Sequence, residues 1–153
     1  MEDMQKQAKK KALRLLECMD RTEAQLRLKL KQSGYTEEIV EEAVSYVKSF
    51  GYIDDVRYAE RFVESRKSAK SKQEIYAALL QRGLTKDAIE HAMEICYAEY
   101  SEMQTIQCII RKKNISIETC DDAGKRKIYN YFARKGFRNE DIRQVIQVSS
   151  LNA

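Results

Sequence analysis

The stretch that decides the fold is residues 50–62, which read FGYIDDVRYAERF. Its glycine can adopt the left-handed backbone conformation that closes a helix, because glycine has no Cβ. One of the two aspartates can then accept hydrogen bonds from the free amides of the next helix, at the positive end of that helix dipole. The aromatic and aliphatic residues between them are predicted to fill the gap. We therefore expect a buried corner between two helical units, formed by Gly51, Tyr52, Ile53, Asp54, Asp55 and Phe62.

The composition favours helix along the rest of the chain. The 153 residues include no proline and only five glycines, and 34% of them are charged. Such a chain, rich in Glu, Lys, Arg, Ala, Leu and Ile, is typical of an all-α protein. The 43% of hydrophobic residues is enough for a packed core.

Several classes of function find no support in the sequence. The polar start at residues 1–6 lacks the hydrophobic segment of a signal peptide, and no apolar run is long enough to span a bilayer, so we expect a soluble cytoplasmic protein. No glycine-rich nucleotide loop is present. We predict no enzyme activity and no cofactor.

Metal binding is not expected either. The four cysteines form no CxxC pair, and His91 is the only histidine that could complete a site. Free cysteine is usually buried, so we predict reduced and mostly buried thiols at Cys18, Cys96, Cys108 and Cys120.

Helix-start signals divide the chain before the corner. Apolar residues at helical spacing predict a first helix over residues 8–19. Thr22 and Gln25 form a capping box that opens a second helix, whose inward side chains are predicted to be Leu26, Leu28 and Leu30. Thr36 is predicted to cap a third helix that runs to the corner.

The same signals return after the corner. A helix is predicted from Val56 to Lys67, and Ser71 and Glu74 form a second capping box. Thr85 caps the next helix, which either runs on or bends near Tyr100 before the following apolar set. An irregular stretch at residues 112–124 precedes the last two helices, with predicted caps at Asp121 or Asp122 and at Asn139.

Three stop glycines, Gly34, Gly83 and Gly136, reveal a repeat. They stand 49 and 53 residues apart, and apolar residues recur at the same offsets around each of them. We therefore predict three tandem three-helix units, residues 1–51, 52–98 and 99–153, in one elongated, curved array with its function along a surface.

The charge of +4 is unevenly distributed. Residues 1–50 carry +1, residues 51–100 carry −1 and residues 101–153 carry +4. Runs of charge are usually solvated faces, but two basic runs on such an array favour a polyanionic partner, either nucleic acid or an acidic protein surface. Most tyrosines fall on apolar stripes and are predicted to pack in the core. Tyr131 lies off its stripe and is the candidate for an interface.

The corner and its surroundings resemble the RecX family of regulatory proteins. The resemblance rests on residues 51–59 with Phe62 and Arg66, and continues through Arg82-Gly83-Leu84. Arg21–Leu26 is similar to the first unit of the family and Arg134–Phe137 to the last, so the resemblance covers roughly residues 10–147. One departure is the stretch Lys67–Lys72, which has no glycine where many members have a Lys-Gly pair.

The resemblance implies a modulator, mainly an inhibitor, of the RecA recombinase that lies in the groove of the RecA–DNA filament and dampens strand exchange, ATP turnover and the SOS response. We expect a monomer whose partner is the RecA filament, and direct contact with single- or double-stranded DNA stays open. Two other readings stay open: a sequence-nonspecific DNA-binding helical protein, and a helical scaffold for another partner. The expected contact residues are Arg57, Arg61, Arg66, Lys67, Lys70, Lys72, Arg126, Lys127, Arg134 and Lys135.

Overall fold

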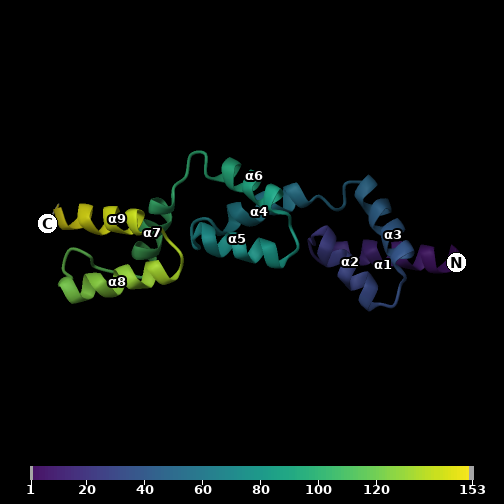
Figure 1. The fold of residues 1–153 in the computed structure, drawn as a ribbon, viewed down its shortest axis with the longest axis horizontal. Coiled ribbons are helices and arrows are strands. Elements are labelled where there is room, and N and C mark those ends of the chain that lie inside the picture. The colour runs from purple at the N-terminus through teal and green to yellow at the C-terminus, as the bar shows by residue number, and fades with distance from the viewer. Residues whose placement is uncertain (1, 152–153) are drawn as a thin grey trace. The chain divides into compact units, whose positions relative to one another are not determined.

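The computed structural model describes residues 2–151, and within that range it consists of nine α-helices with no strand (Figure 1). This confirms the all-α prediction. Residues 1, 152 and 153, which the predicted first and third units include, lie outside the described residues. The helices are α1 (Glu2–Cys18), α2 (Glu23–Gln32), α3 (Glu37–Ser49), α4 (Asp55–Arg66), α5 (Lys72–Gln81), α6 (Lys86–Cys96), α7 (Glu102–Lys112), α8 (Asp122–Arg134) and α9 (Asn139–Leu151).

The predicted start signals are confirmed at five helices. In both capping boxes the hydroxyl accepts from the backbone amide three residues on, and that residue's side chain accepts from the cap amide: Thr22 with Gln25, and Ser71 with Glu74. The side chains of Thr36, Thr85 and Asp121 likewise accept from the amides of Ile39, Ala88 and Gly124. Local hydrogen bonding therefore fixes where these helices begin.

The three stop glycines and the corner residue Gly51 also behave as predicted. Gly34, Gly51, Gly83 and Gly136 have φ values of +93°, +74°, +84° and +92°. A residue with a Cβ pays about 1–2 kcal/mol in this left-handed region, so glycine is the residue that ends a helix there at least cost.

Two predictions about individual helices are wrong. Leu28 is 57% exposed and does not face inward, because it lies two residues from the buried Leu26 and Leu30, on the other side of α2. Asn139 is not a cap, because α9 already includes it; the preceding Arg138 pairs with Asp141 instead.

The undecided boundary after α6 is now resolved. Helix α6 ends at Cys96 and α7 begins at Glu102, so the chain breaks at residues 97–101. The Gln104 side chain accepts from the Ser101 amide at 2.8 Å. Ser101 and Gln104 have the spacing of a capping box, and this signal in the sequence could have placed the boundary.

The chain forms two compact units. The first contains the residues up to Arg61 together with Leu79–Ala92, and the second contains Phe62–Ala78 together with the residues from Met93 onward. The core of the first gathers side chains from α1, α2, α3 and the turn after α3: Ala8, Ala12, Leu26, Leu30, Ile39, Val40, Ala43, Val44, Val47 and Ile53. The predicted three-unit division stays a prediction.

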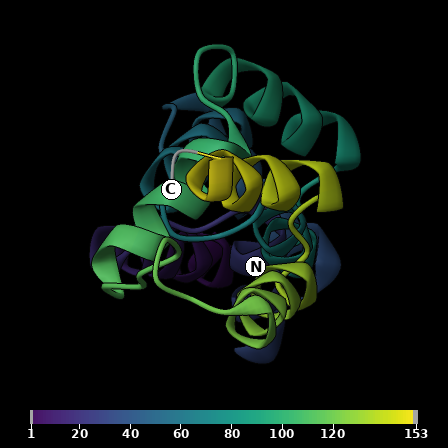
Figure 2. The same cartoon turned by 90° about the vertical axis from the view of Figure 1, so that its left-hand side faces the viewer.

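The core of the second unit is built around Phe132, which is fully buried. Its ring meets Phe137 edge to face at a centroid distance of 5.6 Å. Helices α8 and α9 lie side by side in both cartoon views (Figures 1 and 2). The other buried members are Ile106, Ile109, Ile117, Ile142, Val145 and Ile146.

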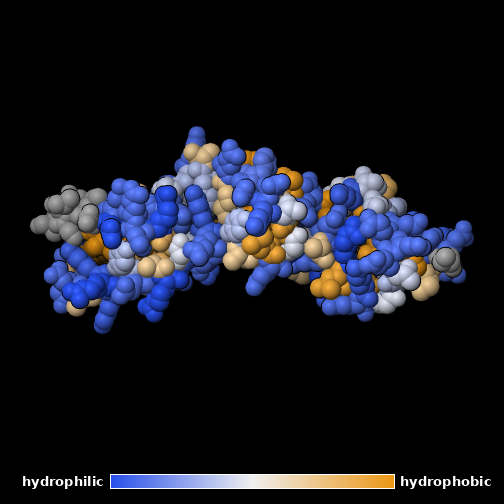
Figure 3. All heavy atoms as spheres, viewed as in Figure 1, coloured by the Kyte–Doolittle hydropathy of each residue, from blue (hydrophilic) through white to orange (hydrophobic). Residues whose placement is uncertain are grey.

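The surface is mostly polar. Figure 3 shows hydrophilic residues over most of the visible face, with hydrophobic side chains in small separate patches. No described helix combines the length and the apolar character needed to cross a membrane.

Candidate functional site

The corner closes α3 as its sequence predicts. The amide of Gly51 donates to the carbonyl of Lys48 at 3.0 Å, and the amide of Tyr52 donates to that of Val47 at 3.1 Å. The next residue, Ile53, is only 4% exposed and belongs to the core of the first unit. The turn therefore ends one helix and anchors the chain with a single aliphatic side chain.

The prediction that Tyr52 fills the gap is wrong, because this side chain is 57% exposed. Its ring stacks on Phe50 at a centroid distance of 5.8 Å, and Phe50 meets Tyr46 edge to face at 5.1 Å. Because Ile53 already occupies the inward position, the side chain of Tyr52 points outward from the left-handed turn. We call Tyr46, Phe50 and Tyr52 the aromatic row.

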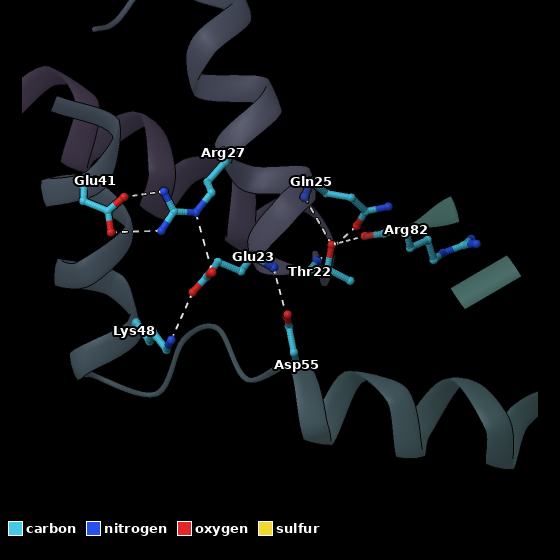
Figure 4. A network of polar contacts seen from close by, with 8 residues as sticks. All are labelled: Thr22, Glu23, Gln25, Arg27, Glu41, Lys48, Asp55 and Arg82. Atoms are coloured by element: carbon cyan, nitrogen blue, oxygen red, sulfur yellow. Dashed lines mark hydrogen bonds and ion pairs between the residues drawn. The ribbon is translucent and has the colours of Figure 1, made fainter. Parts of the chain in front are cut away.

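The two aspartates of the corner have different roles. Asp54 caps α4, because its carboxylate accepts from the amide of Arg57 at 3.2 Å. The carboxylate of Asp55 instead accepts from the amide of Glu23 at 2.9 Å, at the start of α2 (Figure 4). One aspartate therefore starts its own helix, and the other ties that helix to α2.

A polar network surrounds this tie (Figure 4). The Thr22 hydroxyl, which caps α2, also donates to the carbonyl of Arg82 at 2.6 Å. The Glu23 carboxylate pairs with Lys48 of α3 at 3.1 Å, and Arg27 donates two hydrogen bonds to Glu41. The start of α2 is thus bound to α3, to the start of α4 and to the turn after α5.

The second unit contains the same arrangement at matching positions. The Ser71 hydroxyl, which caps α5, donates to the carbonyl of Lys135 at 2.5 Å. The amide of Lys72 donates to the Glu102 carboxylate at 3.3 Å, as that of Glu23 does to Asp55. Each set combines a buried hydroxyl that caps one helix with a carboxylate from another helix. We call Thr22 with Asp55 the first capping joint and Ser71 with Glu102 the second. Thr22 and Ser71 are both fully buried.

A stop glycine completes each capping joint. A Cβ built on Gly83 would lie 2.3 Å from the Cβ of Ala24, and one built on Gly136 would lie 2.5 Å from the Gln73 side chain. By contrast, a Cβ on Gly34 would meet nothing within 4 Å. At both joints glycine is therefore needed for two reasons. It allows the close approach of Ala24 or Gln73, and it adopts the left-handed backbone conformation.

The stability of the first joint is expected to depend on pH through Asp55. Burial raises the pKa of this carboxyl, although the hydrogen bond from Glu23 opposes the shift. Because the folded pKa lies above the unfolded one, the unfolding free energy falls as pH rises through the window just above about 3.9. An Asp55→Asn variant keeps an oxygen that can accept from Glu23 but carries no charge. We expect it to be at least as stable as the parent at pH 7, measured by urea unfolding.

The comparison across pH supplies the control for this prediction. The advantage of the asparagine variant should disappear at pH 3, where the aspartate is neutral in both states. An Asp55→Ala variant, which has no acceptor, should be less stable at both pH values. An asparagine variant that loses stability only at pH 7 would show that the charged carboxylate stabilises the joint.

Two of the predicted contact residues meet at the corner. Arg57 and Arg61 line a polar cavity of about 60 Å³ together with Arg21. The carboxylates of Asp20 and Asp54 also line the cavity, and Asp20 pairs with Arg61 at 3.4 Å. Three guanidinium groups against two carboxylates leave the cavity with a positive balance. Its other lining residues are Gly51, Tyr52 and Tyr58.

The middle group of predicted contacts is divided by its environment. The Lys67 ammonium is engaged by other residues of the chain. It donates to the Cys96 carbonyl at 3.2 Å and pairs with the Glu64 carboxylate at 2.9 Å. The Lys72 ammonium lies over the ring of Tyr97, at 4.6 Å from the centroid. These side chains are already held by neighbours in the second unit.

The other two members of the middle group face a groove. The Arg66 guanidinium lies 3.7 Å from the centroid of the Phe62 ring, and Phe62 itself is buried. Arg66 and Lys70 line a groove of about 220 Å³ with Phe62, Glu74, Ile75 and Ala78. Lys70 is exposed. Of the four middle cations, these two line the groove.

The last group of predicted contacts lies on α8 and just after it. Arg126, Lys127 and Arg134 are exposed, and Arg126 lines a cavity of about 330 Å³ with Tyr129. Lys135 is half-buried, and its ammonium lies 5.1 Å from the centroid of the Tyr131 ring. The structure does not bring all four into one cluster.

Four cations at these sites were not among the predicted contacts: Arg21, Lys113, Lys125 and Arg143. Arg21 lines the corner cavity, Arg143 lines the cavity with Arg126, and Lys113 lies beside Tyr131. Lys113 was visible as the end of the run Arg111–Lys113. Arg21 and Arg143 stand alone in the sequence, so no local signal marks them.

None of the four cysteines is in a disulfide, but only Cys96 is buried; Cys18 is exposed, and Cys108 and Cys120 are intermediate. The prediction of mostly buried thiols is therefore wrong, because Cys18 is the last residue of α1, outside the core contacts of that helix. The described residues contain no group of three or more His, Cys, Asp or Glu side chains arranged to hold a metal ion.

Two solved structures share the fold. One is described as the crystal structure of RecX from Lactobacillus salivarius; it is 23% identical, covers 99% of both chains and has a TM-score of 0.86. The other is described as the crystal structure of regulatory protein RecX; it is also 23% identical, covers 95% of this chain and 74% of the other, and has a TM-score of 0.80.

Sequence relatives give a closer match. The chain is 37% identical over 145 residues to regulatory protein RecX of Caldanaerobacter subterraneus subsp. tengcongensis, and it spans 71% of that protein. It is 29% identical over 138 residues to regulatory protein RecX of Clostridium botulinum and spans 65% of it. Residues 8–46 match the first three-helix domain of RecX and residues 54–93 the second. The chain belongs to the RecX family.

Proposed function

We propose that this chain binds the RecA filament on DNA and regulates the recombinase, mainly by inhibiting it. The observation that carries the proposal is family membership together with relatives named regulatory protein RecX. Such a protein works where RecA meets DNA, in the cytoplasm. As a binding protein it needs an interaction surface and no catalytic centre.

The corner of the first unit supports this proposal. The aromatic row lies next to the corner cavity, since Tyr52 belongs to both. Exposed tyrosine beside arginine is the composition that dominates binding energy at protein interfaces. We therefore place Arg57 and Arg61 in the contact surface with RecA, and Lys70 of the second unit as a further contact.

Hydrolysis of ATP by RecA on single-stranded DNA tests the proposal. The purified chain is expected to lower the steady-state rate in a concentration-dependent way. A rate that stays unchanged at a large molar excess of the chain would contradict the inhibitory role and favour a helical scaffold for another partner.

Charge reversal at Arg57 and Lys70 is expected to weaken the inhibition. The Arg57→Glu/Lys70→Glu variant should raise the concentration for half-inhibition by about tenfold or more, since losing about 1.4 kcal/mol of binding changes affinity tenfold. Arg57 lies in the first turn of α4, where an acidic residue is compatible with the helix dipole. The measurement is the ATP hydrolysis rate of RecA against the concentration of each variant.

A matched control makes this test specific. Lys29 and Lys86 are exposed and line none of the corner, groove or α8 surfaces described above. Their double change to glutamate alters the net charge equally and should leave the half-inhibiting concentration within about twofold. Equal losses in both variants would mean that only net charge matters.

The second candidate function is sequence-nonspecific DNA binding, which the excess charge of residues 101–153 favours. A salt titration of DNA binding without RecA separates the two. Phosphate neutralisation gives a steep fall in affinity with salt, whereas a surface directed to RecA alone does not require it.

A further inference from the structure

Two lysines flank a single tyrosine in the second unit. The ammonium of Lys113 lies 4.4 Å from the centroid of the Tyr131 ring, and that of Lys135 lies 5.1 Å from it. The phenol is half-buried, and the neighbouring ammonium groups, first Lys113 and then Lys135, lower the pKa of Tyr131. Two positive charges are thus held against one phenol ring.

Helix ends fix this arrangement. Lys113 is the C-cap residue of α7, followed by Asn114 at φ +54°, and Lys135 is the C-cap residue of α8, followed by Gly136 at φ +92°. The carbonyl of Lys135 is also the acceptor in the second capping joint. The backbone that carries both lysines is therefore defined by helix termination and by the joint.

The two ammonium groups and the two helix ends together carry a net positive charge that one anion could neutralise. Each helix C-terminus carries about half a negative charge, so two ends offset roughly one of the two ammonium charges. Neither lysine has a carboxylate within ion-pair distance among the described residues. One excess positive charge and a phenol O–H match a singly charged oxyanion.

The flanking sequence points to a chain of such anions. Arg111 and Lys112 precede Lys113, and Arg134 precedes Lys135. No acidic residue occurs in residues 108–117 or 123–139. The lysines against the Tyr131 ring make it a poor platform for base stacking and favour contact with the sugar-phosphate backbone.

We propose that Lys113, Tyr131 and Lys135 form a phosphodiester-binding site for a nucleic-acid backbone. The two ammonium groups and the phenol hydroxyl donate to the phosphate oxygens, and Arg111, Lys112 and Arg134 lie along the strand on either side. The site reads no base sequence. It does not rest on the proposed regulation of RecA, and its test needs no RecA.

Binding of a fluorescently labelled single-stranded oligonucleotide to the full chain tests the site. The Lys113→Gln/Lys135→Gln variant is expected to lose about tenfold or more in affinity at low salt. The slope of log affinity against log salt should become shallower by about one unit, because fewer phosphates are neutralised. Tyr131→Phe, which removes only the hydroxyl, should lose affinity severalfold.

The controls decide between this site and its alternatives. Lys10→Gln/Lys29→Gln removes two exposed charges from the first unit and should retain at least half of the parent affinity. Equal loss in this variant, or unchanged binding by Tyr131→Phe and the site double variant, would overturn the proposal. So would polyglutamate that displaces the oligonucleotide as effectively as unlabelled DNA, because the site would then take protein carboxylates. Unchanged helical content by circular dichroism shows that the variants fold.

Discussion

Gly83→Ala is expected to lower the free energy of unfolding by about 2–5 kcal/mol. About 1–2 kcal/mol comes from placing a Cβ in the left-handed backbone region. The rest, about 1–3 kcal/mol, comes from forcing the new methyl group against Ala24, whose Cβ would be only 2.3 Å away. Urea unfolding followed by circular dichroism measures the loss.

Gly34→Ala is the matched control for this change. Gly34 has a similar φ of +93°, but its Cβ would meet nothing within 4 Å. It should therefore lose only the backbone contribution, about 1–2 kcal/mol. Combining Gly83→Ala with Ala24→Gly should recover part of the contact cost, seen as a favourable coupling energy in a double-mutant cycle. Equal losses at Gly34 and Gly83 would contradict the close approach.

Thr22→Val is expected to cost about 2–4 kcal/mol of unfolding free energy. Valine has nearly the same shape but cannot accept from the Gln25 amide or donate to the Arg82 carbonyl. Loss of the cap costs about 1 kcal/mol. The Arg82 carbonyl, which faces the fully buried Thr22, loses its donor, and this adds about 1–3 kcal/mol. The measurement is again urea unfolding.

Two further variants isolate the second hydrogen bond of Thr22. Thr36 caps α3 through the Ile39 amide only and is exposed, so Thr36→Val should cost about 1 kcal/mol. Thr22→Ser keeps the hydroxyl and should retain most of the stability. If Thr22→Val costs no more than Thr36→Val, the bond to Arg82 contributes nothing to folding.

The helix boundaries were predictable because short-range contacts set them. Thr22 and Gln25, like Ser71 and Glu74, satisfy each other's amides within four residues, and the glycine turns follow from one backbone angle. These signals need no knowledge of the rest of the fold. They predicted where α2, α3, α5, α6 and α8 begin, but they left the boundary between α6 and α7 undecided.

The joints were not predictable, because they depend on long-range contacts. Asp55 meets Glu23 across 32 residues and Ser71 meets Lys135 across 64. A sequence motif shows that Asp55 can cap a helix but does not say which one. The same limit applies to Lys67, which looked like a free cation in a basic run and is bound to the Cys96 carbonyl.

The two capping joints also define a rule for building longer proteins of this kind. Each joint needs a hydroxyl at the start of the middle helix, because that group accepts from its own helix and donates to a carbonyl at once. At the start of α8 the corresponding residue is Asp121, whose carboxylate only accepts. A further helical unit engineered in the same register would set its carbonyl oxygen against that carboxylate, with no hydrogen between them. A designer who wished to add such a unit would first have to replace Asp121 with serine or threonine.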